Sequence, residues 1–156
     1  MLRVDNLDVF HGDAQALDGV SLKIDEGTIV AIVGANGAGK TSLIRTVAGM
    51  HRPARGRIAF RGIEIGGWES HRVCNLGIGQ VAEGRQVFAT LSVAENLEIG
   101  AMLARARGSR ARNLERVFAL FPILAAASSM NEIASASISA GRSRRGGIWI
   151  GITAIR

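Results

Sequence analysis

Hydrophobic and polar positions alternate along the first part of the chain. In LRVDNLDV and ALDGVSLKI the alternation has the period of two that a half-buried strand requires. The run TIVAIV is instead apolar and largely β-branched without interruption, which predicts a strand buried on both faces. The predicted strands therefore cover 2–9, 16–24, 28–33 and 78–81, with a short hairpin over 57–65.

Four other stretches have helical spacing of their apolar residues. Four such residues between 43 and 48 lie on one stripe, which Gly49 ends. Ser92 with Glu95 three residues later is the capping-box pattern of a helix start. The predicted helices cover 40–50, 68–77, 92–103 and 112–121, and Pro122 stops the last of them.

The regular pattern stops after Pro122. Residues 123–156 are rich in Ala, Ser and Gly, and neither helical nor strand periodicity holds for long among them. This segment is therefore predicted to be a divergent tail, out-of-frame or disordered, outside a first domain of residues 1–122.

Composition limits the class of protein. A chain of 156 residues that is 47% apolar can build the core of one ordinary domain. It contains no apolar run of about 18 residues, and its first residues have no secretory apolar core, so neither a membrane span nor a signal peptide is predicted. Cys74 is the one cysteine, which fits a reducing, cytoplasmic setting.

Charge is unevenly distributed along the chain. Residues 1–100 hold 10 basic and 11 acidic residues, whereas residues 101–156 hold 9 Arg and 2 Glu, so the net charge of +6 comes from the last third. A basic end can contact nucleic acid or an anionic membrane surface. Because no aromatic or heptad pattern accompanies the arginines, a solvated helix face with an irregular tail is favoured.

The motif G-x-x-x-x-G-K-[ST] lies between the predicted strand at 28–33 and the predicted helix at 40–50. Its glycines let successive N–H groups point at one anion, and the helix start adds its positive dipole end. Lys40 would reach the β- and γ-phosphates of a nucleotide, and Thr41 would bind Mg²⁺. The predicted nucleotide-binding residues are Gly34, Ala35, Asn36, Gly37, Ala38, Gly39, Lys40, Thr41 and Ser42.

With its flanks, this motif resembles the start of an ABC-transporter ATP-binding domain; GVSLKIDEGTIVAIVGANGAGKTSL is the distinctive part. EGRQVFATLSVAENLEIGA, at 83–101, is similar to the ATP-binding subunits of branched-chain amino acid (Liv-type) importers. The resemblance runs from about residue 2 to 122. It implies an α/β fold, with a P-loop NTPase core, an N-terminal antiparallel β lobe and an incomplete helical lobe from about residue 84.

The resemblance also implies roles for individual residues. The family places an aromatic under the adenine, and His11 stands at that position, while the neighbouring Phe10 is assigned to the core. Glu83, in AEGR, matches the Q-loop acid and would serve Mg²⁺ or the attacking water. His51 and His71 are assigned to the surface, and no metal site other than nucleotide-bound Mg²⁺ is predicted.

Several parts of the family pattern are missing or altered in these 156 residues. None of the 13 acids follows four apolar residues, so no Asp-Glu strand supplies a general base, and no His after His71 can act as the switch histidine. ISAGRSRR could be a degenerate signature through Ser139, Ala140 and Gly141, although an unrelated tail is favoured. The strand before the phosphate loop would then lack a neighbour and leave an apolar face exposed.

Three functions follow from these observations. The first is the ATP-binding subunit of an importer for branched-chain amino acids or related compounds, representing its N-terminal part and binding ATP and Mg²⁺ without efficient hydrolysis. The resemblance implies a second ATP-binding subunit and membrane permease subunits as partners, and a peripheral place at the inner face of the cell membrane. The alternatives are a non-functional remnant of such a subunit and, less favoured, a nucleic-acid-binding P-loop module that uses the Arg-rich end.

Overall fold

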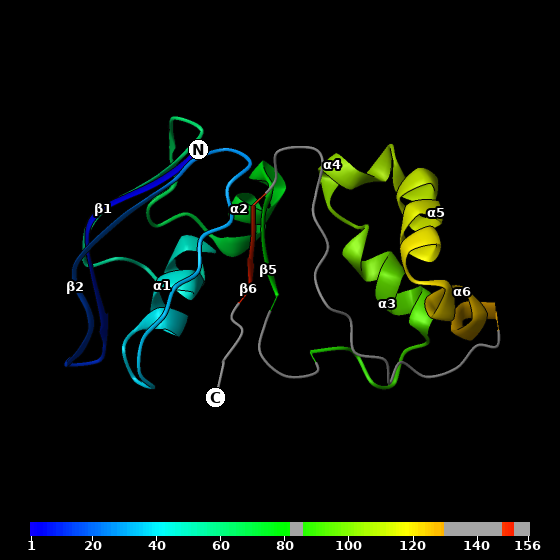
Figure 1. Cartoon of the computed structure of the whole chain (residues 1–156), viewed down its shortest axis with the longest axis horizontal. Coiled ribbons are helices and arrows are strands. Elements are labelled where there is room, and N and C mark those ends of the chain that lie inside the picture. The colour runs from blue at the N-terminus through cyan, green and yellow to red at the C-terminus, as the bar shows by residue number, and fades with distance from the viewer. Residues whose placement is uncertain (82–85, 130–147, 152–156) are drawn as a thin grey trace. The chain divides into compact units, whose positions relative to one another are not determined.

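The computed structural model describes residues 1–81, 86–129 and 148–151 (Figure 1). The elements form two compact units. The first holds residues 1–81 with the strand at 148–151, and the second holds the helices between 93 and 129. No helix among the described residues is long and apolar enough to cross a membrane.

An antiparallel sheet of four strands dominates the first unit, in the order β2-β1-β3-β4 (Figure 1). The predicted strands and hairpin are confirmed here, with slightly different ends. The strands are β1 (Leu2–His11), β2 (Ala14–Ile24), β3 (Arg55–Phe60) and β4 (Ile63–Glu64).

A β-bulge in β1 explains which of its side chains are buried. Leu2 and Val4 point into the core, but the next buried residues are Leu7 and Val9, so the alternation shifts by one position. The register with both neighbouring strands shifts in the same place, where Asn6 has a left-handed φ of 46°. The extra residue keeps both halves of the strand facing the core.

Phe10 was assigned to the core, and this assignment is wrong. Val9 is fully buried and Phe10, the next residue, points to the opposite face of the strand and is 44% exposed. Successive strand residues face opposite sides of a sheet, so burying Val9 leaves Phe10 toward solvent.

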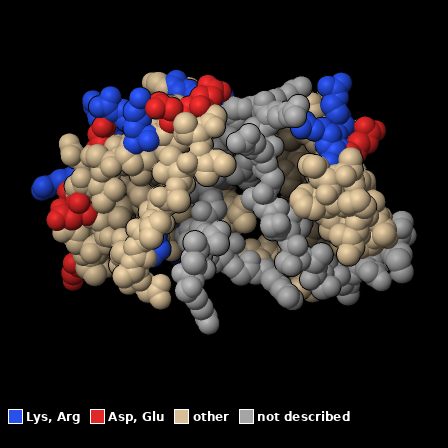
Figure 2. Space-filling model, viewed as in Figure 1, with Lys and Arg blue, Asp and Glu red and all other residues tan. Residues whose placement is uncertain are grey.

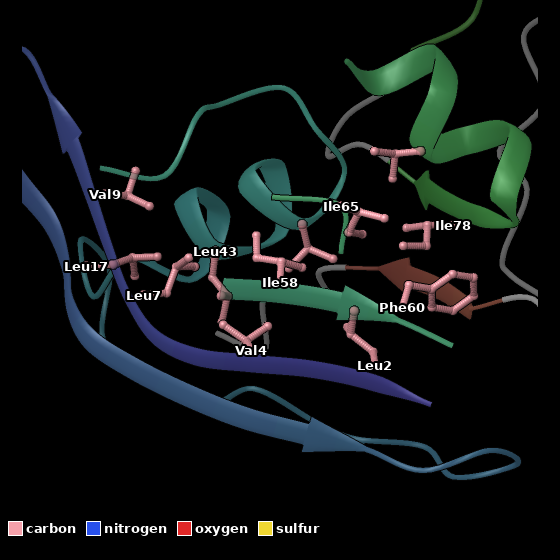
Figure 3. Packing of buried hydrophobic residues seen from close by; sticks show 12 residues of the cluster. Leu2, Val4, Leu7, Val9, Leu17, Leu43, Ile58, Phe60, Ile65 and Ile78 are labelled. Carbon is pink, nitrogen blue, oxygen red and sulfur yellow. The ribbon is translucent and has the colours of Figure 1, made fainter. Parts of the chain in front are cut away.

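Helix α1 (Lys40–Val47) covers one face of this sheet. Leu43 and Val47 join the buried cluster of the strands, and Figure 3 shows Leu43 directed at Leu7 of β1. Ala48 caps the helix and Gly49, at φ 75°, ends it as predicted. A side chain at Gly49 would lie only 2.6 Å from the carbonyl oxygen of Trp68, so both its conformation and its surroundings favour glycine.

Residues 28–33 form no strand, contrary to the prediction. The segment is irregular, and Ile29 and Val33 are 83% and 90% exposed. A buried strand needs neighbours that accept its backbone hydrogen bonds, and no described strand pairs with this one. The sequence predicted that apolar side chains of this segment would be exposed because the strand lacks a neighbour. They are exposed, but the segment that carries them is irregular and is not a strand.

The second sheet joins distant parts of the chain. After α2 (Ser70–Leu76), β5 (Ile78–Val81) pairs in parallel with β6 (Ile148–Gly151), in the register Ile78↔Ile148 to Val81↔Gly151. The helix and strand before residue 82 were predicted, whereas β6 lies in the segment for which no regular element was predicted. Its run IWI is apolar, but glycines flank it on both sides and three residues are too few for a periodic pattern to be recognised.

The described residues of the second unit form four helices. Ser92 and Glu95 form the predicted capping box at the start of the first: Ser92 Oγ accepts from Glu95 N at 3.2 Å, and Glu95 Oε2 accepts from Ser92 N at 2.8 Å. These hydrogen bonds from Ser92 hold the pKa of the Glu95 carboxyl below its usual value. The helices are α3 (Val93–Gly100), α4 (Ala104–Arg107), α5 (Arg110–Leu120) and α6 (Pro122–Ser129).

Pro122 ends α5, as predicted, but it also begins α6. Proline suits the first position of a helix because its fixed φ is helical and its missing N–H has no partner there. The Ala-rich composition of residues 122–129, interpreted as irregular, is instead that of a good helix former, and Leu124 is buried.

Two phenylalanines of the antiparallel sheet give a matched test of this core. Phe60 is 1% exposed and Phe10 is 44% exposed. We expect Phe60→Ala to lower the free energy of unfolding by about 3–5 kcal/mol, because it removes a buried ring and leaves a cavity. Phe10→Ala should cost less than about 1 kcal/mol. Urea unfolding followed by circular dichroism measures both, and equal losses would contradict this packing.

Candidate nucleotide-binding site

The loop of residues 34–39 leads directly into α1. Gly37 and Gly39 have left-handed φ values of 83° and 80°, and Gly39 is the residue before the first turn of the helix. Glycine adopts these angles without the steric cost that a Cβ brings. The sequence therefore allows the chain to curl tightly just before the helix begins.

Gly39 also has no room for a side chain. A Cβ there would lie 2.4 Å from the carbonyl oxygen of Ala16 and 2.6 Å from Cδ2 of Leu17, both in β2. Gly37 has the same backbone conformation, but nothing lies within 4 Å of its Cβ position. The close approach at Gly39 holds the end of the loop against the antiparallel sheet.

Lys40 closes over the loop that precedes it. Its Nζ donates to the carbonyl oxygens of Gly34 and Ala35, at 2.6 and 2.7 Å. The ammonium group therefore lies at the mouth of the loop, where an anion would meet it. A bound phosphate would offer Nζ charged oxygens in place of these two neutral carbonyls.

Backbone N–H groups around the same loop are available to a ligand. Ala38 N donates to Ala35 O at 3.2 Å, and Leu43 N to Gly39 O at 2.9 Å. Six other N–H groups of residues 36–42 have no backbone acceptor in the described part of the chain. They belong to Asn36, Gly37, Gly39, Lys40, Thr41 and Ser42. A set of free donors at a helix start, with a lysine beside it, fits a phosphate chain.

His11 lies beside the start of α1. Its Nε2 is 2.9 Å from Ser42 Oγ, which joins the end of β1 to the first turn of the helix. The residue is exposed, so the ring is accessible to a ligand. The structure thus brings His11 and the loop residues together, although 31 positions separate His11 from Ser42.

A second histidine supports the first. The rings of His11 and His51 meet edge to face, with centroids 4.8 Å apart and planes at 73°. Sequence reasoning assigned His51 to the surface; the residue is half-buried, and its Nε2 is buried without a hydrogen-bond partner among the described residues. Burial, followed by the nearby His11 and Arg45, lowers the pKa of His51 below its usual value. No pattern in the sequence marks this residue; the turn at Gly49 brings it there.

Thr41 stands in the first turn of α1 and is half-buried. No described residue forms a hydrogen bond with its hydroxyl group, so the oxygen is free to bind a cation. The described residues contain no cluster of three metal-binding side chains. Mg²⁺ suits such a site, because it keeps several waters and needs few protein ligands when a nucleotide supplies phosphate oxygens.

Four predicted site residues lie outside the described residues: Glu83, Ser139, Ala140 and Gly141. Their predicted roles therefore stay predictions.

Comparison with known proteins places this loop in a family. Residues 17–153 match the family profile described as ABC transporter. The match covers most of the chain and includes the whole loop. The chain belongs to the ABC transporter family.

Two relatives show which proteins of the ABC transporter family this chain resembles. The chain is 38% identical over 124 residues to the high-affinity branched-chain amino acid transport ATP-binding protein BraG of Pseudomonas aeruginosa, covering 80% of this chain and 53% of that one. It is 34% identical over 100 residues to a probable branched-chain amino acid transport ATP-binding protein, LivG, of Methanocaldococcus jannaschii, covering 64% and 39%. The predicted resemblance to ATP-binding subunits of the Liv type is confirmed.

A solved structure, the ADP conformation of an ATP-binding cassette of an ABC transporter, aligns with a TM-score of 0.59 and 34% identity. The alignment covers 64% of this chain and 39% of that one. The α/β fold class of an ABC ATP-binding domain is thereby confirmed. The chain spans only about half the length, or less, of these relatives.

The two loop glycines allow a controlled test of the site. We expect Gly37→Ala to lower the free energy of unfolding by about 1–2 kcal/mol, the cost of a left-handed non-glycine residue. Gly39→Ala adds a collision with the backbone of β2, so its loss should reach roughly 2–5 kcal/mol. Urea unfolding of the two variants measures the difference. Equal losses would show that the approach of Gly39 to Ala16 is not a constraint.

We expect the free energy of unfolding to decrease as the pH is lowered, because of His51. Because its pKa is lower folded than unfolded, the unfolded chain binds its proton more readily, and acid favours unfolding. The loss should begin as the pH falls through the ordinary histidine pKa of about 6.5 and continue to the lower folded value.

Urea midpoints at pH 7.5 and 5.5 measure this effect. We expect the difference between the two midpoints to shrink in His51→Gln. His71→Gln, which removes an exposed histidine of α2 that lies 3.3 Å from Glu69, is the comparison variant, and the difference should shrink less in it than in His51→Gln. The same shrinkage in both variants would assign the pH dependence to histidines in general.

Proposed function

We propose that this chain is the nucleotide-holding part of the ATP-binding subunit of an ABC importer. The observation that carries the proposal is that Lys40 Nζ and six backbone N–H groups, none with a backbone acceptor among the described residues, belong to one glycine loop and the helix start that follows it. Each is a donor and one is a cation, so together they suit the phosphates of ATP. Membership of the ABC transporter family supports ATP as the nucleotide.

Each residue then has a distinct task when ATP binds. Lys40 exchanges the carbonyl oxygens of Gly34 and Ala35 for β- and γ-phosphate oxygens. Thr41 offers its hydroxyl to the Mg²⁺ that the nucleotide brings. His11 stacks its ring on the adenine, while its hydrogen bond to Ser42 fixes the ring beside the helix.

Branched-chain amino acids, or related compounds, are the proposed cargo. The names of the BraG and LivG relatives support this substrate class. In the assembled transporter, a second ATP-binding subunit and membrane permease subunits would be the partners, and the chain would sit peripherally at the inner face of the membrane. Glu83 and the Ser139–Gly141 segment keep their proposed roles as Q-loop acid and degenerate signature.

Hydrolysis needs a group that activates water. The printed sequence contains no Asp-Glu pair after four apolar residues, so no candidate general base stands where the family carries one. General acid–base catalysis contributes about 10²–10⁴-fold in rate. We therefore propose that these 156 residues bind ATP with Mg²⁺ but do not turn it over at the rate of a complete subunit.

Lys40→Ala tests nucleotide binding directly. We expect affinity for ATP with Mg²⁺ to fall at least about 100-fold, because two charge-assisted phosphate contacts of about 1.5–3 kcal/mol each are lost. Lys23→Ala removes the same side chain from β2, where it pairs with Asp25, and should leave affinity unchanged. Titration with a fluorescent ATP analogue measures both. An unchanged Lys40→Ala affinity would refute the site.

Release of phosphate by the unsubstituted chain tests the second half of the proposal. We expect steady-state release no faster than that of Lys40→Ala under saturating ATP and Mg²⁺. Turnover well above that background would mean that another residue activates the water, and the binding-only proposal would be wrong.

A further inference from the structure

Five of the 20 residues from 101 to 120 are arginines, and one is an acid, Glu115, so this stretch carries a net charge of +4. It includes α4 and α5 of the second unit. Four of the arginine side chains are described, and all four are exposed. Figure 2 shows basic side chains, with acidic ones beside them, at the end of the helical unit where Figure 1 labels α4. We name these four the arginine surface: Arg107, Arg110, Arg112 and Arg116.

Half of the arginine surface has an internal partner. Arg110 forms an ion pair with Glu98 of α3, and Arg107 Nε donates to Met102 O at 3.4 Å. Arg112 and Arg116 form no ion pair or hydrogen bond with any described residue, and the neighbouring Glu115 does not neutralise them through an ion pair either. Two full positive charges therefore face solvent.

These two arginines do not help α5 to form. They are four residues apart, so they stand one above the other on the same face of the helix. Like charges in this arrangement destabilise a helix. Leu120 continues the same row one turn later and is 68% exposed. Internal stability does not account for a row of Arg, Arg and Leu on the outer face.

Aliphatic side chains accompany the charges. Met102, which is 66% exposed, lines a hollow of about 280 Å³ with Arg107, Arg110 and Glu98. Ile123 is also exposed, three residues after Leu120. The aromatics of the same helical stretch, Phe118 and Phe121, are half-buried.

This combination distinguishes between two anionic partners. Surfaces that bind single-stranded nucleic acid stack its bases on exposed aromatic rings. Surfaces that bind a bilayer combine Arg or Lys with exposed apolar side chains, which enter the boundary between headgroups and acyl chains. On the stretch that carries the arginine surface the exposed apolar side chains are aliphatic, which matches the bilayer.

We propose that the arginine surface binds the anionic headgroups of a phospholipid bilayer, with Leu120 and Met102 contacting its apolar boundary. Guanidinium groups pair with phosphate and carboxylate oxygens in planar, two-point contacts, which suits lipid headgroups. This contact goes beyond the proposed function, since it uses lipid directly and does not involve the nucleotide site.

Vesicle co-sedimentation of the full chain tests the proposal. The vesicles are phosphatidylcholine alone or phosphatidylcholine with 30% phosphatidylserine. We expect binding to the anionic vesicles only, weakening as salt rises from 50 to 300 mM. Arg112→Gln with Arg116→Gln should reduce it roughly 10- to 30-fold. Arg112→Lys with Arg116→Lys, which keeps the charge, should retain most of it.

A control separates a local surface from total charge. Arg55→Gln with Arg57→Gln removes the same charge from exposed positions in β3 and should change vesicle binding less than about twofold. Equal losses in the two glutamine variants would overturn the proposal, because net charge alone would then explain binding. Equal binding to uncharged vesicles would overturn it too.

Two further measurements complete the test. If Arg112→Gln with Arg116→Gln weakens binding to a single-stranded RNA but leaves vesicle binding intact, the surface is a nucleic-acid site and the lipid proposal is wrong. ATP titration of the same variant should give the affinity of the unsubstituted chain. Failure of the lipid contact would thus be distinguished from failure of the nucleotide site.

Discussion

The rest of the first unit depends on the burial of one face of α1 against the antiparallel sheet. Leu43 and Val47 join side chains from β1, β2 and β3 of the antiparallel sheet in a single apolar cluster, which places the start of the helix over β1 and β2. A helix of eight residues has little stability by itself, so this burial also keeps it formed. The orientation of Lys40 and of the free N–H groups is therefore a consequence of apolar packing.

Local patterns predicted the elements that are stable through near neighbours. The capping box at Ser92 and the turn at Gly49 were both read correctly, because each depends on residues only a few positions apart. The prediction at 28–33 failed for the opposite reason. The apolar run has strand character, but a strand forms only where another offers hydrogen bonds, and that partner is not a local property. Residues 122–129 were missed because Ala-rich helices lack a strong polar–apolar contrast.

In the candidate site, too, the features that depend on neighbouring residues in sequence were predicted, and those that depend on tertiary contacts were not. The glycine loop and Lys40 were predicted from eight consecutive residues, since contiguous backbone makes the anion cradle. His11 was placed by the family resemblance, and the structure sets it 2.9 Å from Ser42. The contact between His51 and His11 could not be predicted, because the neighbours of His51 in sequence say nothing of the ring of His11, which tertiary folding brings to a centroid distance of 4.8 Å. The collision that excludes a side chain at Gly39 was likewise invisible before β2 and the loop were placed together.

The exposed run TIVAIV has a consequence for how the molecule behaves in bulk. Its six residues carry no charge and no proline, and they are rich in β-branched side chains, which is the composition of segments that stack between chains into cross-β assemblies. Charged or proline gatekeepers are missing within the run, and the nearest charges are Asp25 and Glu26 on one side and Lys40 on the other. Association between chains depends on concentration, so we expect any aggregation through this run to increase with the number of copies that share the volume.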